Sequence, residues 1–287
     1  MKKPNILLFI TDQQRADHVG CYGNKIVKTP NIDAIASKGT RFDRFYVNNP
    51  ICSPNRASLM TGRMPSAHGL RYNGAPLPLT ARTFVESLAD NGYRTSLIGK
   101  SHLQNMTGGP PEWIPSKDNF AVDENGFPCE AVRHNLDSLD YQNENSQNWE
   151  NDPDHKIKLP FYGFDHAEIC TMHADRTGGS YLRWIEEKYP DYKSLRGREN
   201  ALPDNRISTP QAWRTAIPEE FYSTAYIGTR TIDYIEDHAA EHKDRPFFIQ
   251  CSFPDPHHPF TPPGKYWDMY DPASIPLPEW FNEGMSP

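Results

Sequence analysis

The sequence predicts an α/β fold in which helices sandwich a largely parallel, mixed β-sheet. Two short and nearly continuous apolar runs, residues 5–10 and 246–253, have the composition of buried parallel strands. Segments with the apolar spacing of helices alternate with such runs, which is typical of parallel sheets covered by helices. Polar residues follow the predicted strands, at the edge where folds of this class bind ligands.

The first third of the chain begins with the strand at residues 5–10, which ends at Asp12. A short helix is predicted to start at Pro30, because proline suits the first helical position, and to stop at Gly39. Residues 41–47 are predicted to form a second strand.

The next three elements have clear boundary signals. A helix is expected around Pro54 and should stop at Gly62. Residues 83–91 have helical spacing, and residues 94–98 form the next predicted strand.

The remainder of the chain is less regular. Residues 104–165 are rich in Pro, Gly, Asn, Asp and Glu, and we interpret them as a loop-rich insertion. Helices are predicted over residues 175–189 and from Pro218 onwards, the second with Ile232 on its buried face. The run at 246–253 is the last predicted strand.

Composition excludes several classes of function. The net charge of −7 and the absence of a Lys/Arg-rich run give no nucleic-acid-binding footprint. Five cysteines, an odd number, fit neither a disulfide framework nor a zinc pattern. The apolar run near the N-terminus is too short for a signal peptide or a membrane span, so we expect a cytoplasmic protein that does not contact membranes. Homo-oligomerisation is left open.

One segment carries the strongest functional signal. Residues 52–63 read Cys-Ser-Pro-Asn-Arg-Ala-Ser-Leu-Met-Thr-Gly-Arg. This segment resembles the signature of the sulfatase family, C-x-P-x-R followed by a helix and T-G-R. The stretches that are similar to other parts of that family are 4–13, 29–33, 39–42, 99–102 and 255–260. The resemblance covers roughly residues 4–104 and 160–270.

The resemblance implies a fold like that of alkaline phosphatase and the sulfatases. It also implies a sulfuric ester hydrolase, acting on a small-molecule sulfate monoester. In that family a formylglycine-generating enzyme oxidises the cysteine, here Cys52, to formylglycine, whose hydrated aldehyde offers one hydroxyl as nucleophile and expels sulfate with the other. The alternative is that Cys52 is an ordinary buried thiol.

Four further residues have catalytic roles by resemblance. Arg56, one helical turn after Cys52, would hold the formylglycine and the oxyanion; otherwise it is a surface arginine. Lys100 and His102 would balance the sulfate charge and assist proton transfer at position 52. His257 would protonate the leaving group, and its neighbour His258 is expected to serve packing only.

The resemblance places a divalent metal at Asp12, Gln13 and the modified Cys52. Adjacent oxygen ligands at a strand end suit a hard cation. We expect Ca²⁺, with Mn²⁺ and Mg²⁺ as alternatives. Many sulfatases have Asp-Asp where this chain has Asp12-Gln13, and the change resembles phosphonate monoester hydrolases; those relatives tend to lack the Lys100/His102 pair.

Three residues are candidates for substrate contact. Asn73 sits where some relatives place a substrate-contacting asparagine, and its alternative is a turn residue. His173 and Asp175 are candidates to line the substrate mouth, with a surface histidine and a helix-capping aspartate as the alternatives.

The second acidic pair that completes the metal site in sulfatases is not found between Pro259 and Pro287. We therefore expect residues 1–287 to be an incomplete N-terminal catalytic domain of a sulfatase. Two alternatives stay open: a phosphonate monoester or phosphodiester hydrolase of the same superfamily, and a catalytically incomplete fragment.

Overall fold

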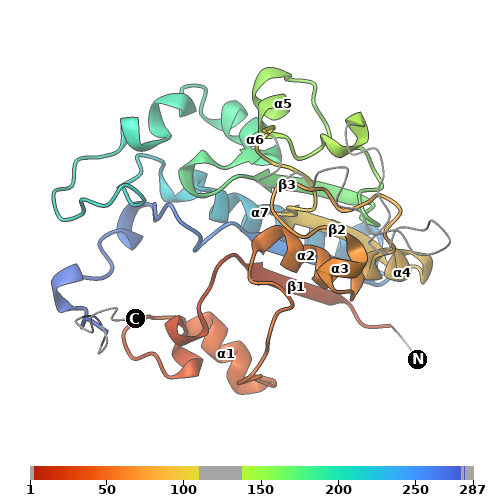
Figure 1. Ribbon diagram of the computed structural model, residues 1–287, viewed down its shortest axis with the longest axis horizontal. Coiled ribbons are helices and arrows are strands. Elements are labelled where there is room, and N and C mark those ends of the chain that lie inside the picture. The colour runs from red at the N-terminus through yellow and green to blue at the C-terminus, as the bar shows by residue number, and fades with distance from the viewer. Residues whose placement is uncertain (1–2, 110–137, 279–280, 282–287) are drawn as a thin grey trace, which may run out of the picture.

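The computed structural model describes residues 3–109, 138–278 and 281 (Figure 1). Its strands form one sheet in the order β1-β5-β2-β3-β4, in which only β4 runs antiparallel to its neighbour. This confirms the predicted α/β fold with a largely parallel, mixed sheet. The strands are β1 (Ile6–Thr11), β2 (Arg94–Gly99), β3 (His166–Thr171), β4 (Gly178–Gly179) and β5 (Phe247–Phe253).

Helices cover both faces of the sheet, and the alternating side chains of β5 show which helix lies on which face. Ser252 accepts a hydrogen bond from Arg56 of α2, whereas its neighbour Cys251 accepts one from Thr231 of α7. Successive side chains of a strand point to opposite faces, so α2 and α7 sandwich the sheet. The helices are α1 (Pro30–Lys38), α2 (Cys52–Thr61), α3 (Pro65–His68), α4 (Phe84–Asp90), α5 (Ser146–Asn151), α6 (Ser180–Lys188) and α7 (Ser223–Glu241).

Aromatic side chains fill the core between the sheet and the helices. Phe248 of β5 meets the edge of Phe84 from α4 at 5.3 Å between ring centroids and stacks on Phe164 at 6.2 Å. Burying one such side chain contributes about 1.5–3 kcal/mol. This packing makes the central strands a firm base for the loops at their carboxyl ends.

The predicted first strand exists, but it is not buried on both faces. β1 lies at the edge of the sheet within the described part of the chain, and every second side chain is more exposed. Phe9 is 54% exposed although it stacks on Phe253 of β5. A run of apolar residues predicts a strand that is buried on both faces, but it does not show whether that strand lies at the edge of the sheet.

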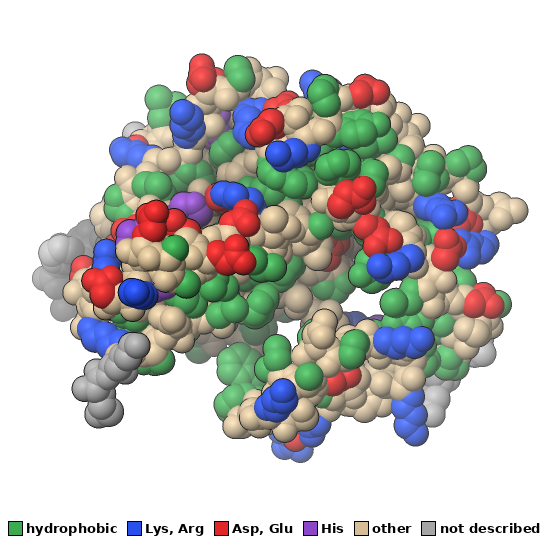
Figure 2. All heavy atoms as spheres, turned by 180° about the vertical axis from the view of Figure 1, so that it is seen from behind, with side chains coloured by type: hydrophobic (Ala, Val, Ile, Leu, Met, Phe, Trp, Pro, Cys, Tyr) green, Lys and Arg blue, Asp and Glu red, His purple; other side chains and the backbone are tan. Residues whose placement is uncertain are grey.

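The prediction of a strand over residues 41–47 is wrong. No regular element is present there; Arg41 pairs with Asp43, and Phe45 is 78% exposed. Together with α1, this stretch belongs to a lobe, residues 15–51, that lies below β1 in Figure 1. Figure 2 shows a hollow between this lobe and the rest of the molecule. A strand needs a hydrogen-bonding partner, and the lobe does not reach the sheet.

The predicted helix over residues 175–189 begins later, at Ser180. The preceding Gly178–Gly179 forms β4, and a Cβ at Gly179 would lie only 2.3 Å from the carbonyl oxygen of Ile169. Two glycines therefore allow the chain to approach β3 closely before α6 starts. β3 itself was not predicted, because His166 and Glu168 interrupt its apolar pattern.

The long helix predicted from Pro218 also starts later, with Ser223 as the first residue of α7. Its buried face is formed by residues such as Tyr226, Ile227 and Tyr234, whereas Ile232 is 57% exposed. The predicted burial of Ile232 is therefore wrong.

The predicted loop-rich insertion at 104–165 contains short helical elements where it is described, namely α5 and a 3-10 turn at Leu139–Tyr141. Residues 110–137 of that insertion lie outside the described residues. Within the described residues, none of the helices has the length and apolar character needed to cross a bilayer.

Candidate active site

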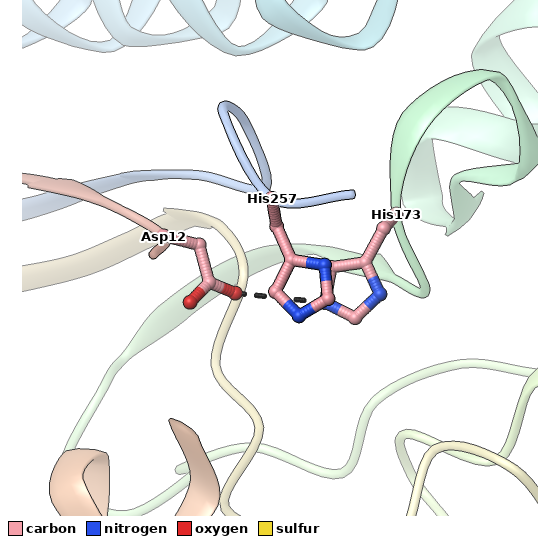
Figure 3. Close-up of side chains that lie close together, drawn as sticks. All are labelled: Asp12, His173 and His257. Atoms are coloured by element: carbon pink, nitrogen blue, oxygen red, sulfur yellow. Dashed lines mark ion pairs between the residues drawn. The ribbon is translucent and has the colours of Figure 1, made fainter. Parts of the chain in front are cut away.

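The carboxyl ends of four parallel strands meet at one edge of the sheet, and polar residues from all four loops converge there. Asp12 follows β1, Lys100 follows β2, His173 follows β3 and His257 lies in the loop after β5. Figure 3 shows Asp12, His173 and His257 arriving from three separate loops. The strand order thus brings together side chains that are far apart in sequence.

Asp12 is the centre of this cluster. Its buried Oδ2 accepts a hydrogen bond from Lys100 Nζ and lies 3.8 Å from Arg56 Nη2 and 3.5 Å from His173 Nε2. Burial alone would raise the pKa of Asp12, but the hydrogen bond from His173 and the charges of Lys100 and Arg56 outweigh it and hold that pKa well below its usual range. Asp12 is therefore an anion at all ordinary pH values.

Lys100 is fully buried, and its Nζ also contacts Nε2 of His173. Burial lowers the pKa of Lys100, while the charge of Asp12 opposes that effect. Burial likewise lowers the pKa of His173, to about 4, so the ring is neutral at pH 7. Nε2 of His173 thus faces both the Lys100 ammonium and, at 3.5 Å, the Asp12 carboxylate.

Cys52 is the first residue of α2 and is half-buried. Its Sγ lies 3.4 Å from Oδ1 of Asn73, the same oxygen that accepts from the Ser53 amide at 3.3 Å. Asn73 thus caps this helix from outside and touches the side chain of Cys52. The amide of Ser53 is already bonded to Asn73, and Pro54 has no backbone N–H. The first turn of the helix therefore offers few free N–H donors at position 52, and its main contribution there is the helix dipole.

Arg56 is buried, so the alternative of a surface arginine is wrong. Its Nη1 donates to the carbonyl oxygen of Lys100 and to Oγ of Ser252, both at 2.9 Å. The guanidinium joins α2 to the ends of β2 and β5 and turns its other nitrogen towards Asp12. This bonding fixes Cys52 relative to the strand ends.

His102 is buried in a left-handed backbone conformation with φ of 59°. Its Nδ1 has no hydrogen-bond partner among the described residues, and burial holds its pKa well below the usual value. Its amide donates to the carboxylate of Glu144, a residue that sequence reasoning missed. No local pattern pointed to Glu144, because it lies inside the irregular segment at 104–165.

His257 stacks on His173, with ring centroids 3.7 Å apart, and on His258 at 4.2 Å. His258 was expected to serve packing only, yet its Nδ1 lies 3.0 Å from Oε1 of Gln13. The structure therefore brings Gln13 and His257 to the same cluster through His258.

Asp175 does not join this cluster, which differs from the prediction that it lines the substrate mouth. Its carboxylate is 1% exposed and accepts hydrogen bonds from Trp213 Nε1, Thr215 Oγ1 and the Gly197 amide. Burial raises its pKa against these hydrogen bonds. Asp175 anchors the loops around residues 197–215 to the end of β3.

The donor atoms near Asp12 suit a divalent cation. Ligand atoms of Asp12, His173 and His257 lie within 4.8 Å of one another. However, Lys100 contacts the nitrogen that His173 would offer to a metal. The described residues give Asp12 Oδ1 no hydrogen bond, so this oxygen is the freer donor for a hard cation, whereas the amide oxygen of Gln13 lies 3.0 Å from Nδ1 of His258.

Comparison with known proteins agrees with this geometry. The family model described as Sulfatase matches residues 4–280. The chain is 30% identical over 270 residues to the uncharacterized sulfatase YidJ of Escherichia coli strain K12, covering 94% of this chain and 42% of YidJ. It is 28% identical over 286 residues to an arylsulfatase of Clostridium perfringens, covering 98% of this chain and 50% of the relative. The chain thus spans about half the length of these curated relatives.

Among solved structures, the phosphonate monoester hydrolase of Agrobacterium radiobacter is similar over 96% of this chain and 45% of that one. The TM-score is 0.64 and the identity is 25%.

Proposed function

This chain belongs to the sulfatase family, and from that premise we propose that it carries the catalytic centre of a sulfuric ester hydrolase acting on a sulfate monoester. One observation supports the proposal most strongly. Cys52 stands at the start of α2 beside two buried cations, Arg56 and Lys100, that share a single adjacent carboxylate, Asp12.

The local charge suits an anionic substrate. The chain as a whole has a net charge of −7, yet Arg56 and Lys100 both face Asp12 at the end of the sheet. Arg56 and Lys100 thus place two buried cationic side chains at this edge of the sheet. A sulfate group entering beside Cys52 would meet both of them.

The reaction requires more than a thiol at position 52. We infer that a formylglycine-generating enzyme converts Cys52 to formylglycine, since residues 52–56 carry the C-x-P-x-R pattern. The hydrated aldehyde of that group supplies a nucleophilic hydroxyl and a route for releasing sulfate. Asn73, which touches the Cys52 side chain, would orient it.

A divalent cation is part of the proposal, with Asp12 and Gln13 as its ligands together with modified Cys52. Ca²⁺ suits these oxygen donors, and Mn²⁺ or Mg²⁺ are the alternatives. When bound, the cation supplies Lewis-acid activation at position 52.

The remaining side chains have distinct tasks. Arg56 and Lys100 would bind the sulfate oxygens. His102, whose Nδ1 has no partner within the described part of the chain, would move a proton at position 52. His257 would protonate the leaving oxygen. Burial lowers the pKa of His257 in the free protein, and the charge of Lys100 lowers it further. A bound sulfate would counter that charge and favour the protonated ring.

A phosphonate monoester hydrolase is the second candidate. The similarity to the Agrobacterium radiobacter enzyme and the glutamine at position 13 favour it. The pair Lys100 and His102 favours sulfate, because relatives that cleave phosphonates tend to lack it. Steady-state kinetics on an aryl sulfate and on an aryl phosphonate monoester separate the two. We expect the higher kcat/KM for the sulfate, and the reverse ranking would transfer the assignment to the second candidate.

A further inference from the structure

A buried carboxylate lies directly behind the loop that carries Lys100 and His102. Glu144 is fully buried, and its two oxygens accept hydrogen bonds from three consecutive amides: His102 at 2.6 Å, Leu103 at 2.8 Å and Gln104 at 2.6 Å. Hydrogen bonds to a carboxylate are among the stronger ones in proteins. Three of them on one side chain determine the path of this loop.

The loop at residues 102–104 in turn holds the segment that carries Glu144. The side chain of Gln104 accepts from the amide of Asn143 at 3.0 Å and donates to the carbonyl oxygen of Asp140 at 3.1 Å. Trp149 in turn donates to the carbonyl oxygen of Asn143 at 2.8 Å. Glu144 is therefore held on a fixed segment and can impose its position on residues 102–104.

The loop needs such a support because its backbone is unusual. His102 has φ of 59°, a left-handed conformation that is uncommon for residues other than glycine and that persists where surrounding contacts support it. The backbone of Lys100 is already held, because its amide donates a hydrogen bond to the carbonyl oxygen of Ser252 at 2.8 Å. For His102 the described residues provide the Glu144 carboxylate as the backbone partner.

We propose that Glu144 is a positioning residue that holds His102 in its catalytic geometry through the three amide hydrogen bonds. The proposal rests on the function proposed above, since it concerns proton transfer by His102. Glu144 does not touch the substrate itself. Loss of its carboxylate would leave the pocket chemically intact but would move the imidazole.

The test uses the protein co-produced with a formylglycine-generating enzyme, with Glu144→Gln as the main variant. Glutamine keeps the size but presents N–H groups to at least one of the three amides. We expect kcat on an aryl sulfate to fall about 10- to 100-fold, as small misplacements of catalytic groups do, while KM changes less than about 3-fold. Amide hydrogen exchange at residues 102–104 should accelerate specifically.

Glu168→Gln is the matched control. Glu168 lies on β3, and its largely buried carboxylate accepts hydrogen bonds from Arg230 and Tyr226. This variant should lose stability without changing kcat or the exchange of residues 102–104. If Glu144→Gln retains kcat as the control does, or if its KM changes as much as its kcat, the positioning role is refuted.

Two outcomes separate this inference from the proposed function. An unmodified or inactive wild-type protein would count against the function, yet exchange at residues 102–104 would still report on Glu144. If Glu144→Gln does not fold, amide hydrogen exchange of residues 102–104 in the wild-type protein is the test. Slow exchange of these three amides supports the inference, and exchange as fast as in exposed loops overturns it.

Discussion

Lys100 Nζ donates a hydrogen bond to Asp12 Oδ2 inside the protein, although the two residues are 88 positions apart in sequence. The pair joins the ends of β1 and β2, which are not neighbours in the sheet, since β5 lies between them. At this position the Asp12 carboxylate faces two buried cations, Lys100 and Arg56. A charged ligand that binds here therefore interacts with all three side chains together.

Replacing Lys100 by methionine should destabilise the protein. Methionine fills a similar volume but leaves the Asp12 carboxylate without its nearest cation, and an uncompensated buried charge costs about 3–5 kcal/mol. Because Arg56 remains at 3.8 Å, we expect the lower end of that range. Urea unfolding at pH 7 measures the effect. Adding Asp12→Asn to Lys100→Met should recover part of the loss, and a double variant no more stable than the single one would contradict the pairing.

Replacing Cys52 by alanine should abolish hydrolysis while leaving the fold intact. The side chain is half-buried and its contact with Asn73 is at 3.4 Å, so little packing is lost. In the parent protein co-produced with a formylglycine-generating enzyme, the peptide bearing position 52 should react with a hydrazide. Mass spectrometry decides the point, and persistent alkylation of Cys52 by iodoacetamide under those conditions would count against the proposed modification.

Removing the Asp12 carboxylate should remove divalent-metal binding. Asp12→Asn keeps the shape but loses the charge that offsets desolvation of a cation, so calorimetric titration with Ca²⁺ should show no saturable heat. Asp33→Asn is a suitable control, because Asp33 is an acidic residue of the lobe that bonds the Cys21 amide instead. Equal Ca²⁺ affinity for parent and Asp12→Asn would place the metal elsewhere.

Glu168 should make stability depend on pH in the acidic range. Burial raises the pKa of Glu168, but the hydrogen bond and charge of Arg230 outweigh it and lower that pKa to about 2. A lowered carboxyl pKa stabilises the fold above the unfolded value near 4.5, and the contribution is lost as pH falls towards 2. Since Arg230 is partly exposed, we expect about 2 kcal/mol at pH 7.

The comparison of Glu168→Gln with the parent protein measures this contribution. The difference in unfolding free energy between the two should be largest at pH 7 and should shrink as pH approaches 3. A difference that is independent of pH would show that packing, and not charge, accounts for it.

Local signals were sufficient for much of the fold and for part of the site. Nearly continuous apolar runs predicted β1 and β5, and the caps around α2 and α4 predicted their limits, because these features act within a few residues. The motif over residues 52–63, from Cys52 to the Thr-Gly-Arg extension, carried the resemblance to the family. The strand predicted at residues 41–47 was wrong, because a segment with strand-forming aromatic residues does not reveal whether a neighbouring strand is there to pair with it.

The sequence by itself determined the α/β class, the sulfatase motif and the residue types available for chemistry. The tertiary structure decided which of those residues meet. It joined Asp12 to Lys100 and His173, placed Asp175 away from them and put Glu144 behind His102. These contacts depend on strand order and on the paths of long connections, which arise from packing of the whole chain and leave no trace in a local pattern.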